Sequence, residues 1–178
     1  TLVDDAMAAG DPFGVPGGRD PVLAAQGLLV AADDSDGAYP SGLAAIASAA
    51  VRLHRLTAHA DYRDAASAAM ERVAAAAVHH PLAHGAALGV LSELARPVRQ
   101  LVVVSDDPDA PAAARARFWQ GGLTLVVSRA QAAEWTAQRF ELLEGRSSVP
   151  GVATAYLCED FVCRLPVTDE AEFAALLT

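Results

Sequence analysis

The segment TAYLCEDFVCRLPVTD, residues 154–169, decides how the second half of this chain is interpreted. Two short apolar runs flank an acidic pair, a pattern that is typical of a β-hairpin. The two cysteines of the chain, Cys158 and Cys163, stand five positions apart within this hairpin. Thr168 and the acidic residues after it then predict the N-terminus of a last helix, which Thr168 caps.

The role of the two cysteines depends on where the hairpin turns. If Glu159-Asp160 is a two-residue turn, the cysteines lie diagonally, with Cα atoms about 7–8 Å apart, which is too far for an unstrained disulfide. If residues 159–162 form the loop, the cysteines are directly opposed and a disulfide can form. A zinc site would need two more ligands, and no CxxC motif supplies them. We expect Cys158 and Cys163 to be structural residues, buried as free thiols, with a disulfide as the alternative.

The segments before the hairpin alternate between strand and helix. Residues 99–105 and 123–128 are short β-branched runs that predict buried strands. Residues 111–120 and 129–140 have the composition of helices. The predicted order is therefore β-α-β-α-β-β-α, and strand-helix-strand units usually form parallel sheets with covered faces.

The first half of the chain is predicted to be mainly helical. Three alanine- and leucine-rich helices are expected at about residues 41–56, 61–79 and 82–95, and their short connections predict antiparallel hairpins. Residues 1–21 are rich in glycine and proline and predict irregular structure, whereas residues 22–31 form a short apolar run that fits either a strand or a buried helical segment.

The composition changes near Pro97, which is the one plausible boundary in the sequence. We therefore expect a helical region at residues 1–96 and an α/β segment at residues 97–178. The predicted fold class is mixed α and α/β.

The overall composition excludes several classes of function. The chain of 178 residues carries a net charge of −9, which disfavours a nucleic-acid partner. Its apolar runs are shorter than the ~18–20 residues of a membrane span. The first residues lack the basic and apolar regions of a signal peptide and an initiator methionine. We expect a cytoplasmic piece of a longer protein, with no membrane partner.

Metal and nucleotide sites are not expected either. His80 and His84 are four positions apart, but Pro81 between them makes a shared helix face doubtful. The loop DDPDAPAA after the first strand stands where open α/β sheets often bind ligands, yet three acids would repel a phosphate. The GxGxxG, GK[ST], GxSxG and HExxH motifs are absent from the sequence. No cofactor and no metal ligand is therefore assigned.

The loop ADDSDGAYPSG, residues 32–42, is the strongest candidate site in the first half. It places three carboxylates, a phenol and a hydroxyl just before a helix. Paired carboxylates at a suitable separation serve as acid and base on a glycosidic bond. The alternative is a solvated turn that caps the helix.

Several of these segments occur together in a known family. They are DGAYPSG, LTAHADYRDAA, RPVRQLVVVS and the hairpin TAYLCEDFVCRLPVTD with its following EAEFAALL. Together they resemble the C-terminal part of the thioredoxin-domain-containing proteins of the DUF255 type, over about residues 17–178. The family pattern usually reads PSGN, whereas Leu43 follows Gly42 here, so a contact of that asparagine would be lost.

The resemblance implies an N-terminal thioredoxin-like domain outside this chain, followed by an (α/α)6 toroid. The toroid is similar to N-acylglucosamine 2-epimerases and six-hairpin glycosidases, so residues 1–96 would form its last antiparallel helical hairpins. The active-site cysteines of such a protein belong to the N-terminal domain, and thiol–disulfide chemistry is therefore not carried over to Cys158 and Cys163.

The function implied by the resemblance is carbohydrate binding or processing by the whole protein, with this portion inactive alone. Asp34 and Asp36 would then act as acid or base, and Tyr39 and Ser41 would bind the sugar where the toroid opens. The competing hypothesis is a non-catalytic module for interaction or oligomerisation. A redox protein is a third possibility, and it requires the hairpin cysteines to be exposed and reactive.

Overall fold

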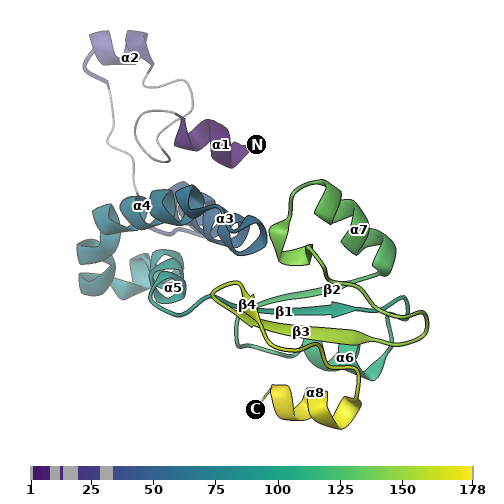
Figure 1. Cartoon of the computed structure of the whole chain (residues 1–178). Helices are drawn as coiled ribbons and strands as arrows, with labels where there is room; N and C mark the ends of the chain where they lie inside the picture. The colour runs from purple at the N-terminus through teal and green to yellow at the C-terminus, as the bar shows by residue number, and fades with distance from the viewer. Residues whose placement is uncertain (1, 9–12, 14–19, 29–33, 178) are drawn as a thin grey trace. The chain divides into compact units, whose positions relative to one another are not determined.

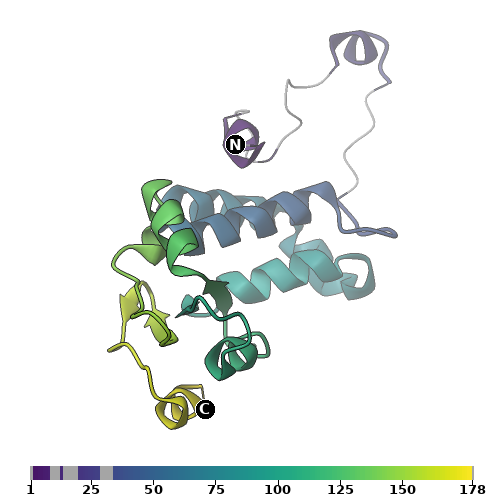
Figure 2. The same ribbon diagram turned by 90° about the vertical axis from the view of Figure 1, so that its right-hand side faces the viewer.

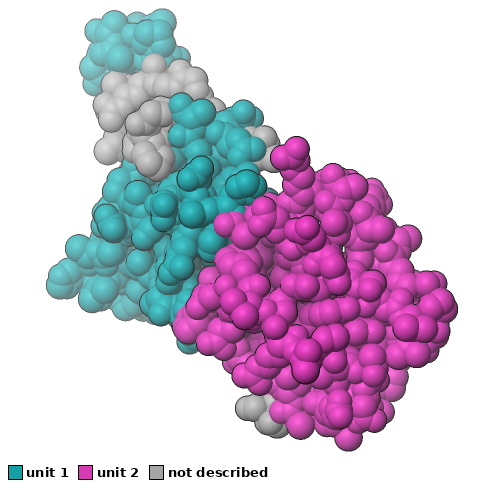
Figure 3. Space-filling model, in the orientation of Figure 1, with its two compact units in different colours: residues 1–54, 59–96 teal, residues 55–58, 97–178 magenta. Residues whose placement is uncertain are grey.

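The structure, a computed structural model, describes residues 2–8, 13, 20–28 and 34–177. The chain forms two compact units, coloured separately in Figure 3. Unit 1 comprises residues 1–54 and 59–96, and unit 2 comprises residues 55–58 and 97–178. Unit 2 thus resumes at Pro97, where the composition of the sequence changes.

Unit 1 is built from helices. They are α1 (Leu2–Met7), α2 (Pro21–Ala25), α3 (Gly42–Thr57, whose last residues belong to unit 2), α4 (Ala60–His79), the 3-10 turn η1 (Pro81–Ala83) and α5 (Gly85–Leu94). The described part of the apolar run at residues 22–31 begins as the short helix α2, and residues 29–31 lie outside the described residues.

Small side chains form the core of unit 1. Ala47 and Ala50 of α3 are fully buried, as are Ala66 and Ala69 of α4, and Met70 fills the space between them. Figure 2 shows α3, α4 and α5 as successive helices joined by short turns, which confirms the expected helices of this region. The described helices do not by themselves close a ring, so the toroid stays a prediction.

Unit 2 contains a four-stranded sheet within its described residues. Its elements are β1 (Arg99–Val104), α6 (Pro111–Ala116), β2 (Leu123–Val127), α7 (Arg129–Ala137), the 3-10 turn η2 (Glu141–Leu143), β3 (Thr154–Glu159), β4 (Val162–Cys163) and α8 (Glu170–Leu176). The predicted β-α-β-α-β-β-α order is confirmed. The strand order is β2-β1-β3-β4, with β1 parallel to β2 and antiparallel to β3, so the sheet is mixed.

Both faces of the sheet are covered, as Figure 1 shows. Leu101 and Val103 of β1 pack with Phe173 of α8 and with α6 on one face. Val102 and Val104 pack with α7 and η2 on the other face. Because successive residues of a strand point to opposite faces, β1 is buried on both sides.

Several predicted helix ends are wrong in detail. The last helix is capped by Asp169 instead of Thr168, since the Asp169 carboxylate accepts hydrogen bonds from the amides of Ala171 and Glu172. The helix α6 ends at Ala116, four residues before the predicted end at Gln120. In the described residues, no helix combines the length and the apolarity needed to cross a bilayer.

Candidate functional site

Asp36 is the organising residue of the acidic loop in unit 1. One carboxylate oxygen, Oδ1, accepts a hydrogen bond from the Ser41 amide at 2.9 Å, and Oδ2 accepts one from the Ala86 amide at 2.8 Å. The Asp36 amide donates to the carbonyl of Ala83. The amides of Ala86 and Ser41, together with the nearby His84, hold the pKa of Asp36 below its usual value. The carboxylate therefore fastens the loop to the start of α5.

The other predicted residues of this loop have different surroundings. Ser41 is buried, and its hydroxyl accepts a hydrogen bond from the Ala44 amide in the first turn of α3, which is a helix-capping contact. The Tyr39 side chain is 84% exposed, and Asp34 is half-buried. The structure thus joins Asp36 and Ser41 through backbone contacts and leaves the Tyr39 ring in solvent. Catalytic roles for Asp34 and Asp36 stay a prediction.

A groove of about 350 Å³ runs between α3 and α5, beside this loop. Most of its lining side chains are small. The lining residues are Pro40, Ala44, Ala45, Ser48, Ala49, Arg52, Ala86, Gly89, Val90 and Glu93. Because most of the lining side chains are small, another helix with small or interdigitating side chains could pack closely against α3 and α5.

The hairpin of unit 2 has the direct pairing of the cysteines that the second expected turn required, but its loop is shorter. Cys158 pairs directly with Cys163, and Glu159 pairs with Val162, so Asp160 and Phe161 form a two-residue turn. Both turn residues have positive φ, 47° and 66°, as tight hairpin turns of this kind require. The turn lies one residue later than the first expectation placed it.

Cys158 and Cys163 form a disulfide, so the expectation of free thiols is wrong. The physical reason is the register: the later turn places the two residues opposite each other on β3 and β4, where their side chains leave the same face of the sheet. The turn itself is fixed to the start of the sheet, because the Asp160 carboxylate accepts from the Val98 amide at 3.1 Å and the Asp160 amide donates to the Val98 carbonyl.

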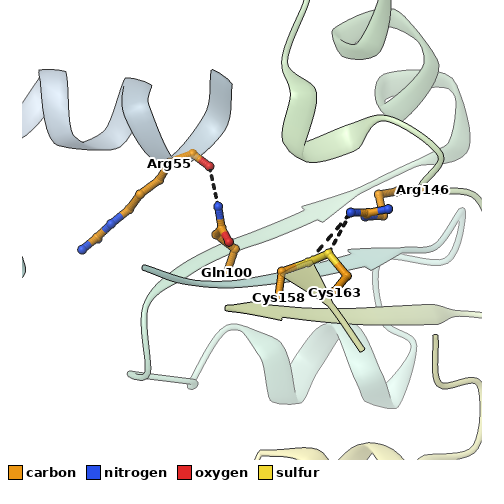
Figure 4. Close-up of a disulfide and its surroundings, with 5 residues drawn as sticks. All are labelled: Arg55, Gln100, Arg146, Cys158 and Cys163. Atoms are coloured by element: carbon orange, nitrogen blue, oxygen red, sulfur yellow. Dashed lines mark hydrogen bonds between the residues drawn. A yellow bond between two sulfur atoms is a disulfide. The ribbon is translucent and has the colours of Figure 1, made fainter. Parts of the chain in front are cut away.

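Arg146 lies against the disulfide, as Figure 4 shows. Its Nη2 atom is 2.7 Å from Cys163 Sγ and 4.0 Å from Cys158 Sγ. The guanidinium carbon also lies 5.3 Å from the centre of the Tyr156 ring, within the range of a cation–π contact. The sequence does not point to Arg146, because this residue stands in a loop and no spacing relates it to the cysteines.

A second cavity, of about 310 Å³, opens at the carboxyl end of β1. Ser105, Asp107, Gly151, Asp169 and Phe173 are among the residues that line it. A thioredoxin-type centre would place a CxxC motif beside such a strand-helix-strand unit, but the loop from β1 to α6 contains no cysteine. The hydroxyl of Ser105 donates to the carbonyl of Asp107, which is a turn contact.

No metal centre emerges from the described part of the chain, where no three histidine, cysteine or acidic side chains are grouped closely enough to hold an ion. Asp106 and Arg129 form an exposed ion pair, with Nε and Oδ2 at 2.5 Å. The amide and guanidinium of Arg129 hold the pKa of Asp106 below its usual value.

Comparison with known proteins finds similarity to spermatogenesis-associated protein 20 from Homo sapiens, Rattus norvegicus and Mus musculus. Each is 26% identical to this chain over 149 residues, which cover 82% of this chain and 19% of the relative. No protein-family model matches the chain, and no solved structure matches it. The chain therefore spans about a fifth of the length of the relatives that it matches.

Proposed function

We propose that this chain is a non-catalytic assembly module of a longer polypeptide, and that its helical unit docks against further helices of that polypeptide. The groove between α3 and α5 carries this proposal. The docking helices would belong to the remaining hairpins of an (α/α) toroid. The proposal also includes an N-terminal thioredoxin-like domain in the same polypeptide and a cytoplasmic location for the whole protein.

The groove has the surface that helix packing needs. Ala45 and Ala49 of α3 line it together with Ala86 and Gly89 of α5, and these residues are among the smallest available. Small residues at a contact allow two helices to approach toward the short end of the usual 8–10 Å axial separation. The similarity to proteins of which this chain matches 19% supports a helix of the same polypeptide as the occupant.

The polar contacts of the acidic loop also favour an assembly role. Both oxygens of Asp36 accept backbone hydrogen bonds, and the Ser41 hydroxyl caps α3. A general acid or base needs an oxygen that can reach the proton it transfers. Asp36 and Ser41, two of the four residues predicted to bind or process a sugar, therefore use their side-chain oxygens to accept hydrogen bonds from backbone amides.

The first test is the size of the native gene product, measured by immunoblot of the source cells with an antibody against this chain. A band far above 18.4 kDa is expected, because the module would be part of a much longer protein. A band near 18.4 kDa would overturn the proposal.

The second test places a large side chain in the groove of the full-length protein. Gly89 is suited to this, because an added Cβ there meets no atom within 4 Å and the unit itself should still fold. Gly89→Leu is expected to separate this module from the preceding helices, detected as new proteolytic cleavage between them. Ala68→Leu, at an exposed position of α4, is the matched control and should leave the cleavage pattern unchanged.

Carbohydrate binding at the acidic loop is the second candidate. One observation favours it: the exposed ring of Tyr39 stands beside Pro40, which lines the groove, and sugars commonly stack on such rings. Titration of the full-length protein with neutral oligosaccharides tests the idea. Binding that is lost in both Tyr39→Ala and Asp34→Asn would support it, and binding unaffected by both changes would assign the sugar to another part of the protein.

A further inference from the structure

The two cysteines of the hairpin disulfide differ in their exposure to solvent. Cys158 is fully buried in the core on the α7 face of the sheet, whereas Cys163 is only half-buried. Cys163 ends β4, a two-residue strand at the edge of the sheet. An external thiolate can therefore approach the disulfide at Cys163, and Cys158 is the sulfur placed to leave.

Arg146 is placed to stabilise the negative charge that such an attack produces. Its Nη2 atom lies 2.7 Å from Cys163 Sγ and 4.0 Å from Cys158 Sγ, and a neighbouring guanidinium favours the thiolate over the thiol at either sulfur. Its position is fixed by the Tyr156 ring below it and by the Tyr156 hydroxyl, which donates to the Ser147 carbonyl at 2.7 Å and accepts from the Ser147 amide. A leaving sulfur with a stabilised thiolate speeds thiol–disulfide exchange.

We propose that the Cys158–Cys163 disulfide is a redox-active site that exchanges with dithiols through Cys163, with Arg146 as the positioned cation. A thiolate of the dithiol attacks Cys163 Sγ, the S–S bond breaks, and its electron pair leaves on Cys158 beside Arg146. The second thiol of the dithiol, as its thiolate, then attacks the dithiol sulfur that is now bonded to Cys163. The bond to Cys163 breaks, and Cys163 leaves as a thiolate. The dithiol loses two electrons and two protons and becomes a disulfide, while the chain gains two electrons and its sulfurs take up the protons.

The surface around Cys163 favours a protein as the source of the dithiol. Val162 and Leu165 stand within two residues of Cys163 and are 76% and 87% exposed, so this short segment presents apolar side chains to solvent. Exposed apolar residues that cluster at one place are typical of contact surfaces. Small dithiols offer the same chemistry without using these two side chains, and the two sources can therefore be separated by experiment.

The test measures reduction of the folded, oxidised chain, first by dithiothreitol and then by reduced thioredoxin as the protein dithiol. Trapping with iodoacetamide and peptide mass spectrometry gives the rate, and circular dichroism shows that the fold persists. We expect Arg146→Gln to slow reduction roughly tenfold, because the thiolates released in the two steps, first Cys158 and then Cys163, lose their cation. Arg164→Gln removes the same charge from the exposed residue next to Cys163 and should change the rate by less than about twofold, because the guanidinium that lies against the two sulfurs belongs to Arg146.

Two further variants separate the outcomes. Arg146→Lys keeps the charge and should restore much of the rate, which a purely packing role of Arg146 would not predict. The double variant Val162→Ser/Leu165→Ser should slow thioredoxin but not dithiothreitol; equal rates in both assays would assign the site to small dithiols.

Two results would overturn the proposal. One is reduction that occurs only after unit 2 has been unfolded by denaturant, because the disulfide would then be purely structural. The other is an equal effect of Arg146→Gln and Arg164→Gln, because the guanidinium of Arg146 would then have no special role.

Discussion

The Asp36 carboxylate accepts a hydrogen bond from the backbone amide of Ala86, which lies 50 residues later in the sequence, at 2.8 Å. The same carboxylate accepts from the Ser41 amide, so one side chain joins the loop before α3 to the first turn of α5. Backbone amides at a helix start have no partner within the helix, and an acidic side chain that satisfies them stabilises the helix. Asp36 therefore acts as a long-range cap.

Replacing Asp36 by alanine should destabilise unit 1 by about 1 kcal/mol, the usual cost of losing a capping side chain. Urea unfolding followed by circular dichroism measures the change. Asp34→Ala, two residues earlier in the same loop, is the control and should change the free energy of unfolding by less. Equal losses from the two variants would show that the two amide contacts of Asp36 contribute nothing of their own.

The pH dependence of stability should include a contribution from the ionisation of Asp36. Because its pKa is lowered in the folded chain, its contribution to stability is present above the unfolded value of 3.8 and is lost as the pH falls through the lower folded value. The difference in melting temperature between wild type and Asp36→Asn should therefore be largest near pH 6 and should shrink below about pH 4. A difference that is constant from pH 2 to pH 7 would contradict this linkage.

The turn after α3 contains a residue in an unfavourable conformation. Ala58 has φ of 60°, in the left-handed region, where a Cβ costs about 1 kcal/mol. Ala58→Gly should therefore raise the melting temperature. Ala95, at the end of α5, has φ of −78° and is the matched control: Ala95→Gly should lower the melting temperature, because glycine there only gains freedom in the unfolded chain.

Gln100 is a polar residue at a fully buried position of β1. Its side-chain Nε2 donates to the Arg55 carbonyl at 3.0 Å, as Figure 4 shows. Gln100→Met keeps the length of the side chain but removes this buried hydrogen bond, and the expected loss of stability is about 1 kcal/mol. The exposed Gln138→Met is the control, and a denaturant midpoint that falls equally in both variants would show that the Arg55 contact is unimportant.

The sequence predicted the kinds of element well because its periodic signals are local. The β-branched run of β1 and the alanine-rich helices of unit 1 are determined by residues that are neighbours along the chain. The helix capped by Asp169 shows the limit of such reasoning: Thr168 and Asp169 are both good caps, and the contact of one side chain with two amides selects between them.

The candidate sites were harder to predict because they depend on contacts between distant segments. The disulfide follows from a shift of one residue in the turn, which exchanges diagonal pairing for direct pairing of Cys158 and Cys163. Arg146 reaches the sulfurs from a loop that precedes β3, and Asp36 reaches α5 across 50 residues. The periodicity of a single sequence does not predict such contacts between distant residues.

The hairpin disulfide should contribute modestly to stability in spite of its buried sulfur. It closes a loop with a sequence separation of 5, and the chain-entropy model assigns a loop of this size about 2 kcal/mol. The double variant Cys158→Ala/Cys163→Ala should therefore still fold, with a lower denaturant midpoint. Single variants would leave one thiol beside Arg146 and are less suitable for this measurement.

The contacts of Asp160 with Val98 should keep the hairpin in register without the disulfide. Amide hydrogen exchange in the double cysteine variant measures this, and the protection of the β3 amides that bond to β1 is expected to persist. Complete loss of that protection would contradict the prediction, since the disulfide would then hold the sheet together, and the reduced form required for redox exchange would not be a folded state.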